Sequence, residues 1–72
     1  RGEPGRVDSS LRDIAEAAAA NAEQQAIRRV LQITGGNRSE AARLLRTDYK
    51  TLYLKMKQYV IDAGQFRGSR AP

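Results

Sequence analysis

Apolar residues between positions 10 and 34 recur at steps of three and four, which is the spacing of one face of an α-helix. Ser10 can cap this helix, and Asp13 completes a capping box. Gly35 and Gly36 follow the last apolar position, and glycine supplies the left-handed residue that closes a helix. The pattern predicts a helix over residues 10–34, about 35 Å long at ~1.5 Å per residue. Its apolar stripe consists of Leu11, Ile14, Ala15, Ala18, Ala22, Ala26, Val30 and Ile33, widened by Ile27 and Leu31.

Two shorter apolar patterns follow, separated by the polar residues 46–48. Asn37 is a good N-cap for a helix over residues 37–45, with Glu40 placed to complete the cap. Thr47 or Asp48 can cap a further helix over residues 48–60. Ala41, Ala42, Leu44 and Leu45 form the apolar face of the first helix, and Leu52, Met56 and Tyr59 or Val60 that of the second. With no strand pattern, the fold class expected is all-α.

Two short helices joined by about three residues form a helix-turn-helix. Ala42 is small enough for a close crossing, and Leu45 with Leu52 can hold the crossing together. In such a unit the second helix enters the major groove of DNA, with its N-terminal residues toward the base edges. The exposed positions predicted for that helix are Asp48, Tyr49, Lys50, Tyr53, Leu54 and Lys57.

Both ends of the chain differ in composition from the predicted domain over residues 10–63. Residues 1–9 read as a flexible linker or tag remnant, and residues 64–72 as a disordered tail, because both stretches are rich in glycine, serine and proline. Neither a signal-peptide pattern nor an apolar run of membrane-spanning length is present. The expectation is a soluble protein with no membrane association.

The net charge of +5 is unevenly placed. Residues 1–36 carry five basic and five acidic side chains, whereas residues 37–72 carry eight basic and three acidic ones. The whole excess therefore lies in the half that contains the helix-turn-helix. Such an asymmetry indicates a polyanionic partner, and a solubilising basic face is the alternative.

The composition argues against catalysis and metal binding. The chain has no cysteine and no histidine, so we expect no disulfide, no thiolate or imidazole metal ligand and no histidine base. The stretch "TGGN" (34–37) lacks the preceding strand and the spacing of a phosphate-binding loop. The prediction is no enzyme, no catalytic residue, no metal and no cofactor.

The rest of so short a chain is not expected to cover the first half of the long helix. Its alanines would let another helix approach closely, which favours a subunit contact and a homodimer. The alternative is an exposed alanine helix, which propensity alone permits. The residues predicted for the dimer interface are Leu11, Ile14, Ala15, Ala18, Ala22 and Gln25.

The stretches "TGGNRSEAARLL" (34–45) and "TLYLKMKQY" (51–59) resemble the Fis-type DNA-binding domain. The resemblance covers about residues 11–61, and is greater to the C-terminal domains of NtrC-like, sigma-54-dependent activators than to stand-alone Fis. It implies an intertwined or antiparallel helical homodimer that binds double-stranded DNA. It also implies a bacterial, cytoplasmic, nucleoid-associated protein whose full-length form has an ATPase domain and acts on sigma-54 RNA polymerase at upstream enhancers.

The resemblance also suggests roles for single residues. Asn37, Ser39 and Thr51 match positions that touch the DNA backbone, and Tyr49 and Tyr53 match positions that hold arginine in Fis. The predicted DNA-binding set is Asn37, Arg38, Ser39, Arg46, Asp48, Tyr49, Lys50, Thr51, Tyr53, Lys55 and Lys57.

Three positions depart from the family pattern. Arg46 and Val60 stand where glycine is common, and Leu54 stands where a basic residue is common. Because a left-handed arginine is unfavourable by about 1 kcal/mol, we expect other torsions at Arg46.

The function predicted is sequence-specific DNA binding that anchors a sigma-54-dependent activator at enhancer sites. Two alternatives are a stand-alone Fis-like nucleoid protein and a helical dimerisation or protein-interaction module that does not bind DNA. The latter predicts weak, salt-insensitive behaviour with duplex DNA, whereas specific binding weakens steeply with salt.

Overall fold

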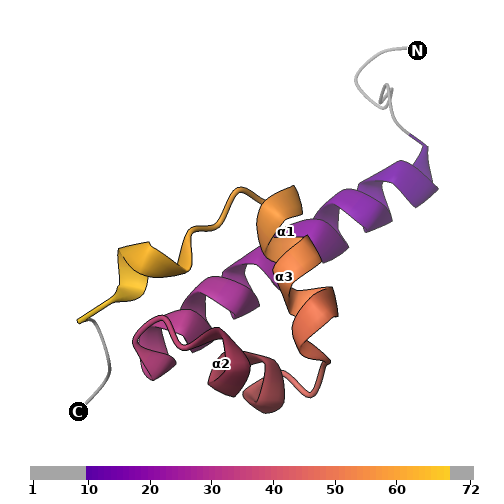
Figure 1. Cartoon of the computed structure of the whole chain (residues 1–72). Coiled ribbons are helices and arrows are strands. Elements are labelled where there is room, and N and C mark those ends of the chain that lie inside the picture. Colours follow the sequence, from indigo (N-terminus) through magenta and orange to yellow (C-terminus); the bar gives the residue numbers. More distant parts are fainter. Residues whose placement is uncertain (1–9, 69–72) are drawn as a thin grey trace.

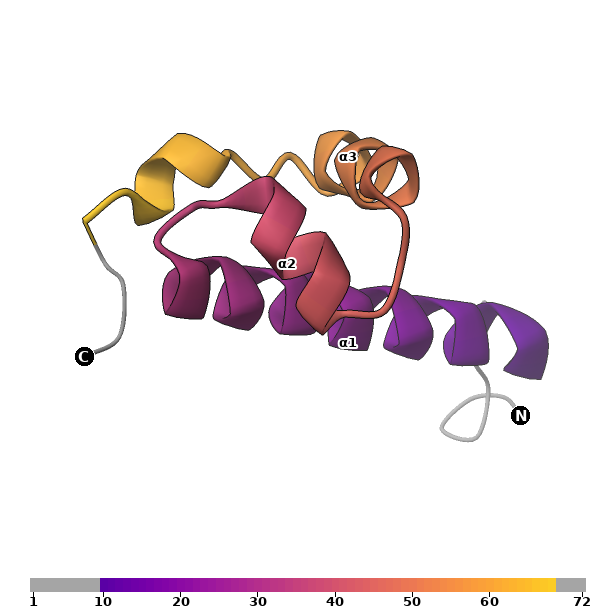
Figure 2. The ribbon, with the colours of Figure 1, turned by 60° about the horizontal axis from the view of Figure 1, so that its bottom comes forward.

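The computed structural model describes residues 10–68, which contain three α-helices and one short 3-10 helix. The helices are α1 (Leu11–Thr34), α2 (Arg38–Leu44), α3 (Tyr49–Gln58) and η1 (Ala63–Phe66). Over the described range no residue lies in a strand, so the all-helical fold class is confirmed. Figures 1 and 2 show α2 and α3 on one side of the second half of α1, while the first turns of α1 extend beyond them.

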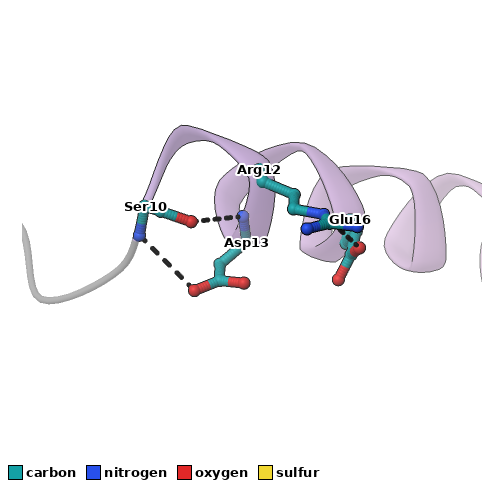
Figure 3. A network of polar contacts seen from close by, with 4 residues as sticks. All are labelled: Ser10, Arg12, Asp13 and Glu16. Carbon is teal, nitrogen blue, oxygen red and sulfur yellow. Dashed lines mark hydrogen bonds and ion pairs between the residues drawn. The ribbon is translucent and has the colours of Figure 1, made fainter.

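Local hydrogen bonds define both ends of α1. The Asp13 amide donates to Ser10 Oγ at 3.2 Å, and the Ser10 amide donates to Asp13 Oδ2 at 3.4 Å, as in a capping box (Figure 3). In the next turn Arg12 pairs with Glu16, with 3.6 Å between Nε and Oε2. Gly35 ends the helix in the left-handed conformation, with φ of 67°.

The core lies where α2 and α3 cross the second half of α1. Ala41 and Ala42 are buried at the crossing, where small side chains let the helix backbones approach. Leu45 is half-buried and packs against this core. The buried apolar residues are Ile27, Leu31, Ala41, Ala42, Leu52, Met56 and Ile61.

The buried face of α1 is part of the stripe that the spacing predicted. Ile27 and Leu31, which widen that stripe, are buried and Val30 packs against the core, but Ile33 is 42% exposed. Ile27, Leu31 and Thr34, spaced by four and three, are the buried residues of this helix. The two smaller helices pack on this part of the stripe, and the periodicity of α1 alone does not determine which part they cover.

The recognition helix ends earlier than predicted. It was expected to reach residue 60, but α3 ends at Gln58 because Val60 adopts a left-handed φ of 55°. The Ile61 amide then donates to the Met56 carbonyl at 2.8 Å, which closes the helix in a Schellman-type motif. Val60 is consequently exposed, while Ile61 turns into the core.

The disordered tail predicted for residues 64–72 is wrong for residues 64–68. Asp62 caps η1 by accepting from the Gly64 amide at 2.9 Å. Ala63 and Phe66 are half-buried and pack against the core, and η1 lies against the C-terminal end of α1. A single aromatic anchor and a polar cap order this segment, despite its glycine-rich composition. Residues 69–72, and the predicted linker over residues 1–9, lie outside the described residues.

Gly36 lies close to the backbone of η1. Its φ is +87°, and an added Cβ would lie 2.6 Å from the Ala63 carbonyl oxygen.

We expect Gly36→Ala to lower the free energy of unfolding by more than about 1 kcal/mol, since both the torsion and the contact are unfavourable. Thermal melts followed by circular dichroism measure this. Gly68→Ala is the control, because Gly68 has φ of +81° but no atom within 4 Å of its Cβ position. Equal melting temperatures for the two variants would contradict the contact with Ala63.

Candidate nucleic-acid interface

The turn between α2 and α3 has a defined geometry. The Thr47 amide donates to the Ala42 carbonyl at 3.0 Å, and the Arg46 amide donates to the Arg43 carbonyl at 3.1 Å. Arg46 is left-handed, with φ of 56°, so the expectation of other torsions at this residue is wrong. The surrounding hydrogen bonds hold it in the conformation that glycine would adopt more easily. Its side chain is exposed beside the start of α3.

Asp48 and Thr51 form the N-terminal cap of α3. Asp48 Oδ2 accepts from the Thr51 amide at 3.1 Å, and Asp48 Oδ1 accepts from the Thr51 hydroxyl at 2.6 Å. The hydroxyl bond, followed by the amide bond, lowers the pKa of the Asp48 carboxyl. Both residues were predicted to bind DNA, and both are exposed, but their side chains already bind each other. Their direct role in this structure is to fix where the recognition helix begins.

Two tyrosine rings and two cations form a row along one side of α3. The rings of Tyr49 and Tyr53 stack with their centroids 6.4 Å apart and their planes 12° apart. Arg38 Cζ, from the start of α2, lies 5.9 Å from the Tyr49 ring centroid. Lys57 Nζ lies 5.6 Å from the Tyr53 ring centroid. Cations at such distances are attracted by the ring face, by about 0.5–1 kcal/mol at exposed sites. The row joins α2 to α3 and holds a cation at each end.

Lys50 lies on the exposed surface of α3, as does Lys57. With Arg38 they form a cationic surface from two helices, which we call the basic face (Arg38, Lys50 and Lys57). The sequence placed all three in the DNA-binding set, and the structure leaves each of them exposed.

Lys55 lies on a different side of α3. Its Nζ donates to Glu23 Oε1 on α1 at 2.9 Å, and the Tyr59 hydroxyl donates to the same oxygen at 2.5 Å. The Tyr59 and Lys55 hydrogen bonds lower the pKa of Glu23, and Glu23 in turn raises the pKa of Lys55 and of Tyr59. Lys55 was predicted to bind DNA, and in this structure its side chain connects α3 to α1. Its partner is 32 positions away, so no local pattern could show this.

Asn37 and Ser39 lie exposed at the start of α2. Asn37 is the N-cap, and its Oδ1 accepts from the Glu40 amide at 3.0 Å. Ser39 lies in the first turn beside Arg38. Of the predicted DNA-binding residues, the start of α2 and the outer side of α3 bring together Arg38, Tyr49, Tyr53 and Lys57, whereas Lys55 lies apart.

Arg67 is a residue that the sequence left unassigned. The segment with η1 brings it to a polar hollow of about 210 Å³ that Arg38 also lines. Gly36, Asp62, Ala63 and Gly64 complete the lining. Phe66, which packs against the core, was the one available signal that this segment folds back on the domain.

The predicted dimer residues lie along one face of α1. Leu11, Ala15, Ala18, Ala22 and Gln25 follow each other at steps of four and three, and Ile14 lies beside them. All six side chains are exposed, and Leu11 is 81% exposed. The charged residues of the same stretch, Arg12, Asp13, Glu16 and Glu23, lie on the opposite side of the helix. The exposed face is therefore uncharged over four turns.

The described part of the chain offers no candidate metal centre. Residues 10–68 contain no cluster of three acidic, histidine or cysteine side chains placed to hold a metal ion. No helix in the same range is both long enough and apolar enough to cross a membrane. The surface feature that the described residues do present is the cationic, aromatic outer side of α3.

Comparison with known proteins agrees with this geometry. The family described as "Bacterial regulatory protein, Fis family" matches residues 18–59, which include the whole of α2 and α3. This match covers more than half of the chain. The chain belongs to the Fis family. The predicted resemblance is confirmed, and a Fis-family helix-turn-helix is a DNA-binding domain of transcription regulation.

One curated relative is the PTS-dependent dihydroxyacetone kinase operon regulatory protein of Escherichia coli (strain K12). It is 48% identical over 48 residues, which is 67% of this chain. The Fis-family chain spans only 8% of the length of that relative. No solved structure gives a significant match.

Proposed function

We propose that this domain binds double-stranded DNA sequence-specifically as a homodimer and anchors a bacterial sigma-54-dependent activator at upstream enhancer sites. The observation that carries the proposal is the exposed position of α3, whose outer side joins Lys50 and Lys57 to the Tyr49–Tyr53 stack. The recognition helix of a helix-turn-helix lies in the major groove, where phosphates flank its two sides. Support for the regulatory role comes from the Fis-family match and from the relative, which is an operon regulatory protein.

The basic face supplies the electrostatic part of this binding. Lys50 and Lys57 flank the outer side of α3, and Arg38 approaches from the start of α2. Asn37, Ser39 and Arg46 are further backbone contacts in this proposal. Lys55 is left out of the set because Glu23 holds it against α1. Asp48 and Thr51 position the helix and do not themselves neutralise phosphate.

The uncharged face of α1 supports the dimer. Exposed leucine, isoleucine and alanine at steps of four and three match the surface by which two helices pack along each other. Two recognition helices related by a two-fold axis would then occupy successive major grooves, about 34 Å apart. The half-sites of the operator are accordingly inverted repeats spaced by one helical turn.

The remaining parts of the proposal concern the full-length protein. The relative extends far beyond the matched segment, since that segment is 8% of its length. We infer that a full-length regulator also carries an ATPase domain that acts on sigma-54 RNA polymerase. As a DNA-binding regulator of a bacterium it works in the cytoplasm, at the nucleoid. Detecting an ATPase domain in the coding sequence upstream of Arg1 tests this part and separates it from a stand-alone nucleoid protein.

Salt dependence of duplex binding tests the proposal directly. If the basic face and Arg46 make four phosphate contacts per subunit, a dimer makes about eight, and the slope of log affinity against log salt is about −7. Affinity should then fall roughly 10⁴-fold between 50 and 200 mM salt. Lys50→Ala removes two contacts per dimer and should reduce the slope by about 2. Fluorescence anisotropy with a labelled duplex measures both values.

Lys55→Ala is the matched control for this experiment. It removes the same side chain from the same helix, but Lys55 already binds Glu23. We expect a smaller change of slope than for Lys50→Ala. Absence of binding at 50 mM salt, or binding that salt does not weaken, would favour the interaction module without DNA binding.

A further inference from the structure

The outer side of α3 has an apolar centre. Leu54 is 54% exposed, and the neighbouring Tyr53 is 40% exposed. Leu54 contributes little to the fold, because the core of this helix is Leu52 and Met56, which are 1% and 3% exposed. Leu54 and Tyr53 lie in the middle of the helix proposed to enter the groove. Both are exposed, so they are placed to contact an apolar group of the DNA.

Cationic side chains lie around the apolar centre formed by Tyr53 and Leu54. Lys50 precedes Leu54 by one helical turn, and Lys57 follows it by three residues. Lys57 Nζ lies 5.6 Å from the Tyr53 ring centroid, and Arg38 lies beside the Tyr49 ring at the other end of the row. The charges therefore border the Tyr53–Leu54 pair on several sides. Phosphates border the floor of a major groove in a similar way.

The chemistry of the base edges limits which groups in the major groove can contact an apolar side chain. In the major groove the thymine C5-methyl is the apolar group by which a base pair is distinguished. The commonest contact to guanine is a bidentate one from arginine or lysine. The middle of α3 is formed by Tyr53 and Leu54, neither of which offers such a pair of donors. The middle of this helix is therefore suited to a methyl group, and the lysines that could contact guanine, Lys50 and Lys57, lie before and after it.

We propose that Tyr53 and Leu54 determine the specificity of this domain by contact with thymine C5-methyl groups in each half-site. This inference rests on the proposed DNA binding and adds the base that is read. Lys50 and Lys57 neutralise the flanking phosphates, and the stack of Tyr49 on Tyr53 fixes the direction of the reading ring. Each half-site thus holds at least one thymine opposite the middle of α3.

Replacement of thymine by deoxyuridine removes only the methyl group and tests the inference. The 72-residue chain is first used to select duplexes from a random pool at moderate salt. Each thymine of the selected half-site is then replaced singly, and dissociation constants are measured by anisotropy. Loss of a buried methyl is expected to weaken binding roughly fourfold at one or two of these positions. A thymine outside the half-site serves as the control and should show no change.

Variants assign the methyl contact to its residues. The penalty is the dissociation constant with deoxyuridine divided by that with thymine at the sensitive position. In the Leu54→Ala or Tyr53→Ala variant this ratio should fall from about four toward one. With Lys50→Ala, binding should weaken while the penalty stays near fourfold, because phosphate contacts do not sense the methyl. Circular dichroism of each variant verifies that the helices are retained.

Two results would overturn the inference while leaving the proposed function standing. One is a selected site at which no deoxyuridine replacement alters affinity. The other is a penalty that persists unchanged in both the Leu54→Ala and the Tyr53→Ala variants. A chain that binds no duplex even at low salt would instead contradict the proposed function and, with it, this inference.

Discussion

Leu52→Ala is expected to unfold most of the chain at 25 °C. Leu52 is 1% exposed and lies in the core where α3 packs on the second half of α1. Truncation of a buried leucine to alanine costs about 2–5 kcal/mol, because apolar contact is lost and a cavity remains. A single core in a chain below about 70–80 residues rarely supplies more than 3–5 kcal/mol. The loss is therefore comparable to the whole stability of the domain. Urea denaturation followed by circular dichroism at 222 nm measures it.

Leu54→Ala is the matched control on the same helix. Leu54 is 54% exposed, and its change should alter the free energy of unfolding by less than about 0.5 kcal/mol. Both proteins must be compared at one concentration, because dimerisation adds to apparent stability. Equal midpoints for the two variants would mean that α3 does not pack on α1 by its Leu52 side. The basic face would then not be the exposed one.

Ala22→Glu is expected to separate the subunits and to weaken operator binding by 10²–10⁴-fold. Ala22 is exposed in the single chain, in the middle of the uncharged face of α1. In a helix pair formed by this face, two carboxylates would be brought together and removed from water, which is strongly unfavourable. Without the pair, each half-site is bound singly and the gain from linked binding is lost. Analytical ultracentrifugation measures the mass, and anisotropy with the two-half-site duplex measures the affinity.

Glu16→Lys is the control for the charge itself. Glu16 lies on the opposite side of the same helix and pairs with Arg12 in the exposed i,i+4 arrangement. Its reversal should leave the mass unchanged, because that side carries charges already. If Ala22→Glu sediments like the wild type, the uncharged face is not the subunit contact. If Glu16→Lys separates the subunits as well, the contact involves the other side of α1.

Local sequence determined where each helix begins and where α1 ends. Ser10 and Asp13 exchange hydrogen bonds, and Asn37 accepts one from the Glu40 amide, as the sequence indicated. Of Thr47 and Asp48, which the sequence left open, Asp48 caps α3. Gly35 closes α1 in the same way. These interactions depend on side chains a few positions apart, so they can be read from the sequence directly. The helix-turn-helix and its Fis-type pattern follow from these caps and from the apolar spacing between them.

Tertiary structure decided which face of each helix is covered. The spacing in α1 predicted one wide apolar stripe, and the packing of α2 and α3 buried its Ile27 and Leu31, together with Thr34, while leaving Ile33 exposed. In the same way it folded Phe66 back onto the core and ordered a segment whose composition is that of a loop. Periodicity identifies apolar faces, but it does not say which neighbour covers them.

Tertiary structure also divided the lysines of α3 between two tasks. By sequence, Lys50, Lys55 and Lys57 are alike: three cations on one predicted recognition helix. In the fold, Glu23 from α1 binds Lys55 and Tyr59, which are half-buried, while Lys50 and Lys57 remain exposed. The sequence by itself determined the helices, their caps and the DNA-binding family, because these depend on neighbours along the chain. The orientation of individual side chains depended on residues some thirty positions away, and only the packing of α1 against α3 could decide it.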